Sequence, residues 1–262
     1  MSAGHLPILQ VALPLMAAPL CVLLRRPNLA WAFTTLLSWS LLAISILLLI
    51  HVMAEGVISY RLGGWAPPFG IEYRLDALNC FVLLVITAIA AVITPYMRRS
   101  VASEIAAPRH NLFYAVYLLA LTGLLGIVAT GDAFNIYVFM EISSLASYVL
   151  IALGPSRRAR TAAFQYLIMG TIGATFLLIG IGLLYMMTGT LNLADLSQRL
   201  ADAPDMRPIY AAFAFVTIGV LIKLALFPPQ CRFVSICSEK DPGEHNFLMA
   251  EVDEPTDFVK DD

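Results

Sequence analysis

Two side chains of opposite charge stand inside long apolar stretches of this 262-residue sequence. Glu141 lies within AFNIYVFMEISSLASYVLIAL, and Lys223 lies within FAFVTIGVLIKLALFP. A charge near the middle of a bilayer costs about 3 kcal/mol even on lenient insertion scales. Such residues therefore face a protein interior or a wet cavity, pair with each other, and mark ion pathways. We predict that Glu141 and Lys223 form an intramembrane pair.

A lysine paired in this way has the chemistry of a proton relay. Burial weakens a lysine's hold on its proton, and a nearby carboxylate strengthens that hold again. Moving Glu141 relative to Lys223, or changing its partner, would switch the lysine between holding and releasing a proton. The alternative is a structural pair that only joins two helices, and we favour the relay over it.

Hydroxyl groups follow the glutamate along the same stretch. Ser144 and Tyr148 stand three and seven residues after Glu141, so in a helix they share roughly its face. They either serve the carboxylate, directly or through an ordered water, or make ordinary hydrogen bonds between helices. Both interpretations remain open from the sequence.

Three further residues are candidates for supporting the pathway. Asp132 precedes the glutamate's stretch, so it is first a helix N-cap and second part of an ion entrance. Thr217 lies less than two turns before the lysine, where it would loosen the helix. Pro228 stands five residues after Lys223 and must disturb or end that helix. A broken helix beside a charge is a recurrent arrangement at transporter ion sites.

The composition places the chain in a membrane. Hydrophobic residues make up 60% of it and charged residues 13%, against about 25% charged in soluble domains, and the mean hydropathy is +0.81. The net charge of -2 gives no basic field for nucleic acid. No G-x-G-x-x-G follows a strand, and the cysteines match no iron–sulfur or zinc template, so we expect no cofactor, no metal and no catalytic site. These cysteines are Cys21, Cys80, Cys231 and Cys237.

Apolar runs of about 20 residues predict membrane helices. The sequence therefore predicts an all-α integral membrane protein with about seven transmembrane helices. The first run has no basic segment before it and no cleavage site, so we expect a retained helix rather than a signal peptide. The predicted spans are Leu6–Leu24, Leu29–Met53, Ala77–Met97, Asn111–Thr130, Ala133–Leu153, Ala163–Met187 and Ile209–Phe227.

Arginines alternate between the loops in a way that predicts orientation. The loops after the first, third and fifth spans are short and carry eight arginines. The other loops carry four arginines over longer segments. Basic loops stay on the cytoplasmic side, so we expect the N-terminus outside and a bacterial-type cytoplasmic (inner) membrane. The eight are Arg25, Arg26, Arg98, Arg99, Arg109, Arg157, Arg158 and Arg160.

The two long outer loops and the C-terminal segment differ in character. The loop Ala54–Asp76 contains GGWAPPFG, which predicts turns rather than a helix. The loop Thr188–Pro208 spaces its leucines as a short amphipathic surface helix would. Residues 229–262 are polar and acidic and predict a disordered tail. We therefore divide the chain into a membrane domain, 1–228, and a tail, 229–262.

Two charged motifs and one loop resemble a known family. Thr130–Tyr148, TGDAFNIYVFMEISSLASY, is similar to the fifth helix of the antiporter-like subunits of respiratory complex I, related membrane hydrogenases and Mrp sodium/proton antiporters. Gly219–Pro228, GVLIKLALFP, resembles the seventh helix of that family. Gly63–Ile71, GGWAPPFGI, looks most like the D subunit of Mrp antiporters. The resemblance covers residues 1–228.

The resemblance implies a function in ion transport. It places Glu141 and Lys223 at the family's coupled pair on a proton path and Pro228 at a break in the seventh helix. The implied activity is proton translocation, perhaps exchanged for sodium, among other membrane subunits of a complex in a lipid bilayer. Alternatives are a proton-pumping subunit of NADH–quinone oxidoreductase or a membrane hydrogenase, and a membrane scaffold that transports nothing.

The chain departs from the family after Pro228. Family members have about fourteen helices in two inverted five-helix repeats, and they continue after F-P with an L-H-x-W-L-P-like motif. Here the text reads PQCRFVSIC, which is what a frameshift would produce. We expect an N-terminal half in which even the first inverted repeat is incomplete.

Overall fold

The computed structural model describes residues 5–24, 26–65, 70–201 and 206–224. All of them belong to one compact unit, Met1–Pro228. The predicted tail at 229–262, with Cys231 and Cys237, and the predicted helix break at Pro228 lie outside the described residues.

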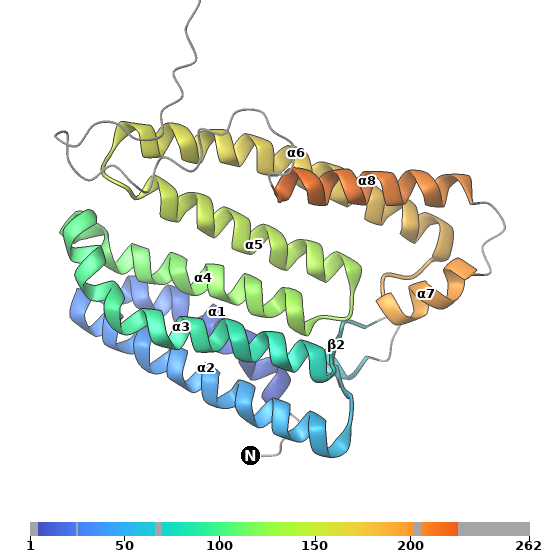
Figure 1. Cartoon of the computed structure of the whole chain (residues 1–262), viewed down its shortest axis with the longest axis horizontal. Coiled ribbons are helices and arrows are strands. Elements are labelled where there is room, and N and C mark those ends of the chain that lie inside the picture. Colours follow the sequence, from blue (N-terminus) through green and yellow to red (C-terminus); the bar gives the residue numbers. More distant parts are fainter. Residues whose placement is uncertain (1–4, 25, 66–69, 202–205, 225–262) are drawn as a thin grey trace, which may run out of the picture. The chain divides into compact units, whose positions relative to one another are not determined.

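Helices dominate the described part of the chain (Figure 1). Asp76, Asp132 and Ser156 each begin a helix by accepting a backbone N–H three residues on, which satisfies a donor that the first turn leaves free. The helices are α1 Leu6–Leu23, α2 Pro27–Glu55, α3 Ala77–Glu104, α4 His110–Ala129, α5 Ala133–Ala152, α6 Arg157–Thr188, α7 Leu193–Ala201 and α8 Arg207–Lys223, with short 3-10 turns η2 Leu62–Gly64 and η3 Ala107–Arg109.

Among the described residues, six helices, α1 to α6, are long and apolar enough to cross a membrane. The seventh predicted span corresponds to α8, which is described over 17 residues to Lys223, and its predicted end at Phe227 lies outside the described residues. The short α7 coincides with the predicted amphipathic helix of the second outer loop. The predicted all-α membrane architecture is confirmed.

A small β-sheet interrupts the helical pattern at the first outer loop. Strand β1 Ile58–Arg61 pairs antiparallel with β2 Glu72–Leu75, with Ile58 opposite Leu75 and Arg61 opposite Glu72. The prediction of turns alone was therefore incomplete. Tyr73 and Leu75, on either side of exposed Arg74, are buried at 4% and 0% exposed, so the sheet covers one end of the helices.

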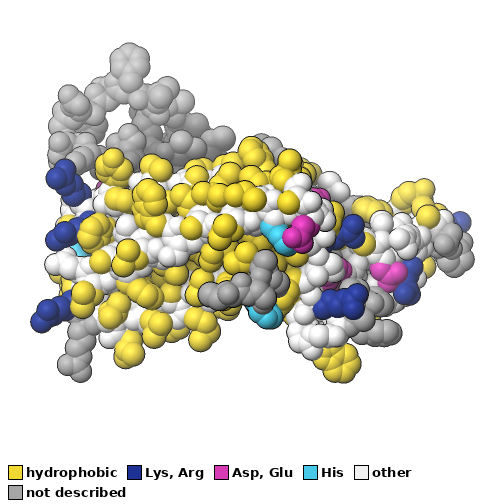
Figure 2. All heavy atoms as spheres, turned by 90° about the horizontal axis from the view of Figure 1, so that it is seen from below, with side chains coloured by type: hydrophobic (Ala, Val, Ile, Leu, Met, Phe, Trp, Pro, Cys, Tyr) yellow, Lys and Arg dark blue, Asp and Glu magenta, His cyan; other side chains and the backbone are white. Residues whose placement is uncertain are grey.

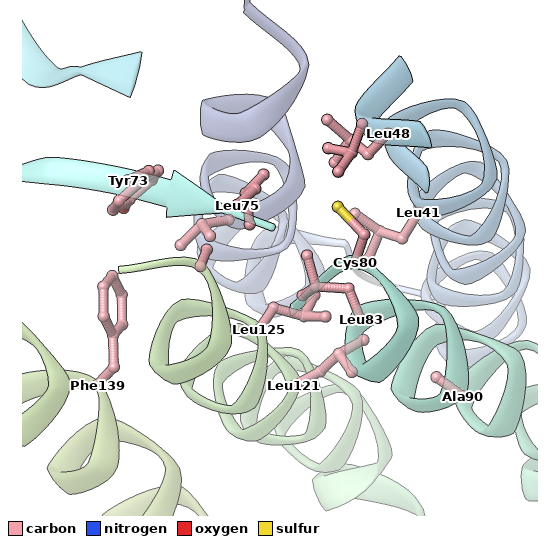
Figure 3. Packing of buried hydrophobic residues seen from close by; sticks show 13 residues of the cluster. Leu41, Leu48, Tyr73, Leu75, Cys80, Leu83, Ala90, Leu121, Leu125 and Phe139 are labelled. Atoms are coloured by element: carbon pink, nitrogen blue, oxygen red, sulfur yellow. The ribbon is translucent and has the colours of Figure 1, made fainter. Parts of the chain in front are cut away.

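The helices pack as a series of neighbours joined by short connections. Contacts join α2 with α3, α1 with α4, α4 with α5, α5 with α6, and α6 with α8. Only Thr130–Asp132 separates α4 from α5, in agreement with the two-residue gap between the predicted spans Asn111–Thr130 and Ala133–Leu153, and the two helices are antiparallel neighbours (Figure 1). Leucines of α2, α3 and α4 form the main core with Cys80 and the ring of Phe139 (Figure 3).

The two ends of the helices carry different charge. Helix direction puts the turns α1–α2, α3–α4 and α5–α6 at one end, which we call the arginine-rich end. Its described residues include seven of the eight arginines named above and one carboxylate, Glu104. The opposite end holds the sheet, the α4–α5 turn and α7, with basic and acidic side chains mixed. Figure 2 shows this contrast across an apolar middle.

Candidate functional site

The structure brings the two predicted charges together. Glu141 stands near the middle of α5 and Lys223 at the described end of α8. The Lys223 Nζ donates a hydrogen bond to Glu141 Oε1, forming an ion pair. Their side chains are 9% exposed for the lysine and 19% for the glutamate. The pair is therefore largely removed from the surface of the described chain.

Ser144 is the second partner of the lysine. Lys223 Nζ also donates to Ser144 Oγ at 3.3 Å. The Ser144 hydroxyl in turn donates to the Met140 carbonyl at 2.8 Å, which occupies its single proton and leaves a lone pair for the ammonium group. Ser144 thus extends the contact of Lys223 from the carboxylate to the next turn of α5.

Glycines on two helices let the lysine reach α5. A Cβ at Gly219 of α8 would lie 2.7 Å from the Gly173 carbonyl of α6, and a Cβ at Gly173 would lie 3.1 Å from the Gly219 carbonyl. The two backbones approach this closely only because both residues lack a side chain. Lys223 follows Gly219 by four residues, so it leaves α8 on the face that packs there.

Tyr148 extends the polar side of α5 toward the arginine-rich end. It is 7% exposed, and its ring packs edge-on against Tyr166 of α6, with 4.8 Å between ring centroids. Its hydroxyl fills the place that a Cβ at Gly170 would take. The sequence reasoning predicted Tyr148 but missed Tyr166.

A cavity of about 280 Å³ lies beside Lys223, Ser144 and Tyr148. Four helices contribute to it: α4, α5, α6 and α8. Its wall combines apolar side chains with the lysine amine, three serine hydroxyls and two tyrosines, which is the usual make-up of a ligand or ion site. The polar lining residues are Ser143, Ser144, Ser147, Tyr148, Tyr166 and Lys223.

Asp132 lies at the opposite end of α5 from Tyr148. Its carboxylate accepts the Asn135 N–H at 2.8 Å as the N-cap of the helix, and it is 8% exposed. Burial raises the pKa of the Asp132 carboxyl above its ordinary value, although backbone hydrogen bonds from Asn135 and Phe134 work against that shift. The geometry is that of the cap, and Asp132 does not line the cavity.

Glu72 was missed by the sequence reasoning. It is buried at 8% exposed, and its carboxylate accepts hydrogen bonds from the Ser59 hydroxyl and from Asn192 Nδ2 at 2.9 Å. Asn192 Oδ1 accepts the Ala194 N–H at 3.0 Å, at the beginning of α7. These contacts tie the sheet to α7.

Thr217 lies apart from the pair. It is exposed and does not line the cavity. Pro228 lies outside the described residues. Cys21 and Cys80 are buried free thiols, and the described residues hold no group of three His, Cys, Asp or Glu side chains arranged for a metal.

Comparison with known proteins identifies what this arrangement resembles. Residues 130–234 match the transmembrane family described as NADH:quinone oxidoreductase/Mrp antiporter. Over 232 residues the chain is 43% identical to NADH-quinone oxidoreductase subunit N of Desulforudis audaxviator, covering 86% of this chain and 45% of that protein. It is 35% identical over 228 residues to an antiporter subunit named mnhD2 of Staphylococcus aureus, covering 86% and 45%. The chain spans about half the length of the curated relatives it matches.

Two solved structures share the fold. One is the membrane-bound sulfane sulfur reductase, an archaeal respiratory membrane complex, with a TM-score of 0.75, 29% identity, and coverage of 83% of this chain and 44% of that chain. The other is the Mrp complex of Dietzia sp. DQ12-45-1b, with a TM-score of 0.73, 26% identity, and coverage of 86% and 42%.

Proposed function

Because this chain belongs to the antiporter-like membrane subunits of NADH:quinone oxidoreductases and Mrp antiporters, we propose that it moves protons across a membrane through Glu141 and Lys223. It does so as one subunit of a multi-subunit cation/proton antiporter, with sodium as the exchanged ion. The matches confirm the family predicted from the sequence, and the activity of the whole protein is our proposal.

The observation that supports the proposal is the position of Lys223. Its amine contacts a carboxylate and a hydroxyl on one helix, Glu141 and Ser144, while lining a cavity. An ammonium group with these two partners is stable only while Glu141 stays charged and close. Any change that draws Glu141 away makes release of the lysine proton into the cavity favourable.

The test is proton flux in proteoliposomes that contain the full chain. An imposed pH gradient, with a sodium gradient in a second arm, is followed with an entrapped pH-sensitive dye. We expect flux above that of empty liposomes, and loss of that flux in Lys223→Met and Glu141→Gln. Thr217→Val is the matched control, because Thr217 is on α8 but outside the cavity, and it should retain the parent rate.

Two results would overturn the proposal. Flux in the parent no higher than in empty liposomes would deny transport by this chain. Normal flux in Lys223→Met would mean that the ion pair only joins α5 to α8, as expected for a scaffold that transports nothing. Dependence of the rate on an opposing sodium gradient decides whether sodium is the coupled ion.

The higher identity to NADH-quinone oxidoreductase subunit N, 43% against 35% for the antiporter subunit, favours a second candidate, a proton-pumping subunit of a redox-driven complex. The relatives and the solved structures belong to multi-subunit membrane complexes. Purifying the tagged chain from native membranes separates the two functions. Flavin and iron–sulfur absorbance in the purified complex supports the redox assembly, and its absence together with sodium-dependent flux supports the antiporter.

Orientation is part of the proposal. We place the arginine-rich end on the cytoplasmic side of a bacterial-type inner membrane, with the N-terminus outside, because seven described arginines lie at that end. A cysteine introduced at exposed Ser100, beside these arginines, should react with an impermeant maleimide only after cytoplasmic access is opened. Labelling in intact cells would invert the orientation.

A further inference from the structure

A tryptophan and an arginine are stacked on the surface of α2 and α3 at the arginine-rich end. Trp31 Nε1 donates to the Thr94 carbonyl at 3.0 Å, which joins the beginning of α2 to the last part of α3. The Arg98 guanidinium lies 5.2 Å from the centroid of the Trp31 ring, within the range of a cation–π contact. The fixed indole therefore holds an otherwise flexible cation at one position.

Nothing in the described chain neutralises this cation. Arg98 and its neighbour Arg99 are exposed, and neither forms an ion pair with a carboxylate of the described residues. Glu104 is the single described carboxylate at this end, and its Oε1 accepts a hydrogen bond from the Ser100 hydroxyl at 3.5 Å. The guanidinium donors of two adjacent arginines are thus available for an anion.

Apolar side chains continue from the arginines toward the middle of the membrane. On α3, Val92 is 62% exposed and Tyr96 is 75% exposed, and on α2, beyond Trp31, Leu36 is 70% exposed. Figure 2 shows an apolar face of the molecule that is bordered by basic side chains at one end. A surface that is cationic at its border and apolar beyond it matches a molecule with an anionic head and hydrocarbon chains.

We propose that this surface of α2 and α3 binds an anionic phospholipid, with its phosphate on Arg98 and Arg99 beside Trp31 and its acyl chains along the apolar residues of both helices. Charge complementarity favours an anionic lipid over a zwitterionic one. The cationic group of a zwitterionic head neutralises the phosphate and repels the arginines. The lipid fixes the ends of α2 and α3 at the membrane surface.

Tryptophan fluorescence in nanodiscs tests the proposal on the full chain. Trp39→Phe and Trp65→Phe leave Trp31 as the only reporter. Nanodiscs of phosphatidylcholine contain a minority of phosphatidylglycerol, and bromine is placed on the acyl chains of one lipid or of the other. The ratio of quenching at equal mole fraction gives the preference of the site. A basic residue near an anionic surface is worth about fivefold in association, so we expect a preference of at least about fivefold for phosphatidylglycerol.

Substitution then assigns the preference to residues. Arg98→Gln with Arg99→Gln should bring the ratio close to one, while Arg74→Gln, an exposed arginine at the opposite end, should leave it unchanged. Circular dichroism checks that each variant is folded.

A ratio near one in the parent, or an unchanged ratio in the double variant, would overturn the proposal. Absence of quenching by both lipids would mean that protein, such as a second copy of the chain, covers the ring. Loss of the preference on adding inorganic phosphate would mean a site for free anions instead of a lipid site.

Discussion

Glu141 and Lys223 can be neutralised one at a time and then together. The losses in the free energy of unfolding of the two single variants should not add up to that of the double variant. Glu141→Gln leaves the lysine without its carboxylate, and Lys223→Met leaves the carboxylate without its cation. Each orphan is largely buried, at 9% exposed for the lysine and 19% for the glutamate. The double variant Glu141→Gln with Lys223→Met leaves neither charge, so most of the destabilisation should disappear.

The loss of stability in each single variant has an upper limit, which is the cost of neutralising the charge that is left without its partner. An orphaned group can shed its charge instead of staying ionised, and in water at pH 7 that costs about 4.6 kcal/mol for a lysine and about 3.7 kcal/mol for a glutamate. Breaking a buried pair costs about 3 to 5 kcal/mol, which is the same range. We expect about 3 to 4.5 kcal/mol for Glu141→Gln and about 2 to 3.5 kcal/mol for Lys223→Met, because the glutamate is the more exposed partner. The double variant should lie within about 1.5 kcal/mol of the parent, so the coupling is at least about 2 kcal/mol.

Unfolding in mixed micelles with increasing dodecyl sulfate, followed by circular dichroism, measures these free energies. Ser144→Ala is the matched control, because it removes the 3.3 Å contact with Lys223 and leaves the ion pair in place. It should cost about 1 kcal/mol. Single variants that each cost under about 1 kcal/mol, or a double variant that costs as much as the two single variants together, would refute a buried, mutually dependent pair.

Three further predictions test the surroundings of the pair. Gly170→Ala should lower the free energy of unfolding by about 1 to 3 kcal/mol in the same assay, because the new Cβ takes the place of the Tyr148 hydroxyl. Gly182→Ala is the control and should not destabilise the protein, because nothing lies within 4 Å of a Cβ at that position. Asn192→Ala removes the acceptor at the beginning of α7, so hydrogen exchange of the α7 amides should accelerate by about fivefold, the equivalent of about 1 kcal/mol; unchanged exchange would contradict the cap. Asp132→Asn keeps an N-capping side chain. Because burial raises the pKa of Asp132, the parent should lose stability relative to this variant as pH rises from 4 to 7. A difference in the free energy of unfolding that does not change with pH would contradict the burial effect.

The sequence predicted the helices well because their signal is local and redundant. A run of about 20 apolar residues spans a bilayer whatever it packs against, and α1 to α6 agree with the predicted spans. The α4–α5 turn was predicted for the same reason, since Gly131 and Asp132 stand alone between two such runs. The pairing of Glu141 with Lys223 followed from the cost of leaving either charge alone in a membrane.

The sheet and its buried carboxylate were missed because their signal is short and non-local. EYRL has only four residues in which to show alternation, and prolines and glycines in the same loop predict turns. Burial of Glu72 depends on Asn192, which is 120 residues away. No pattern within one segment indicates such a contact, so only the fold places it.

The position of Lys223 shows how packing determines chemistry in this chain. Its type and depth follow from the sequence, but its partner depends on how near α8 lies to α5. That separation is set on α6, where Gly173 meets Gly219 backbone to backbone and brings α8 inward by the width of the missing side chains. A larger residue at either glycine would move the lysine away from Glu141 without altering either charge. The two glycines are therefore as important to the geometry of the candidate site as the ion pair itself.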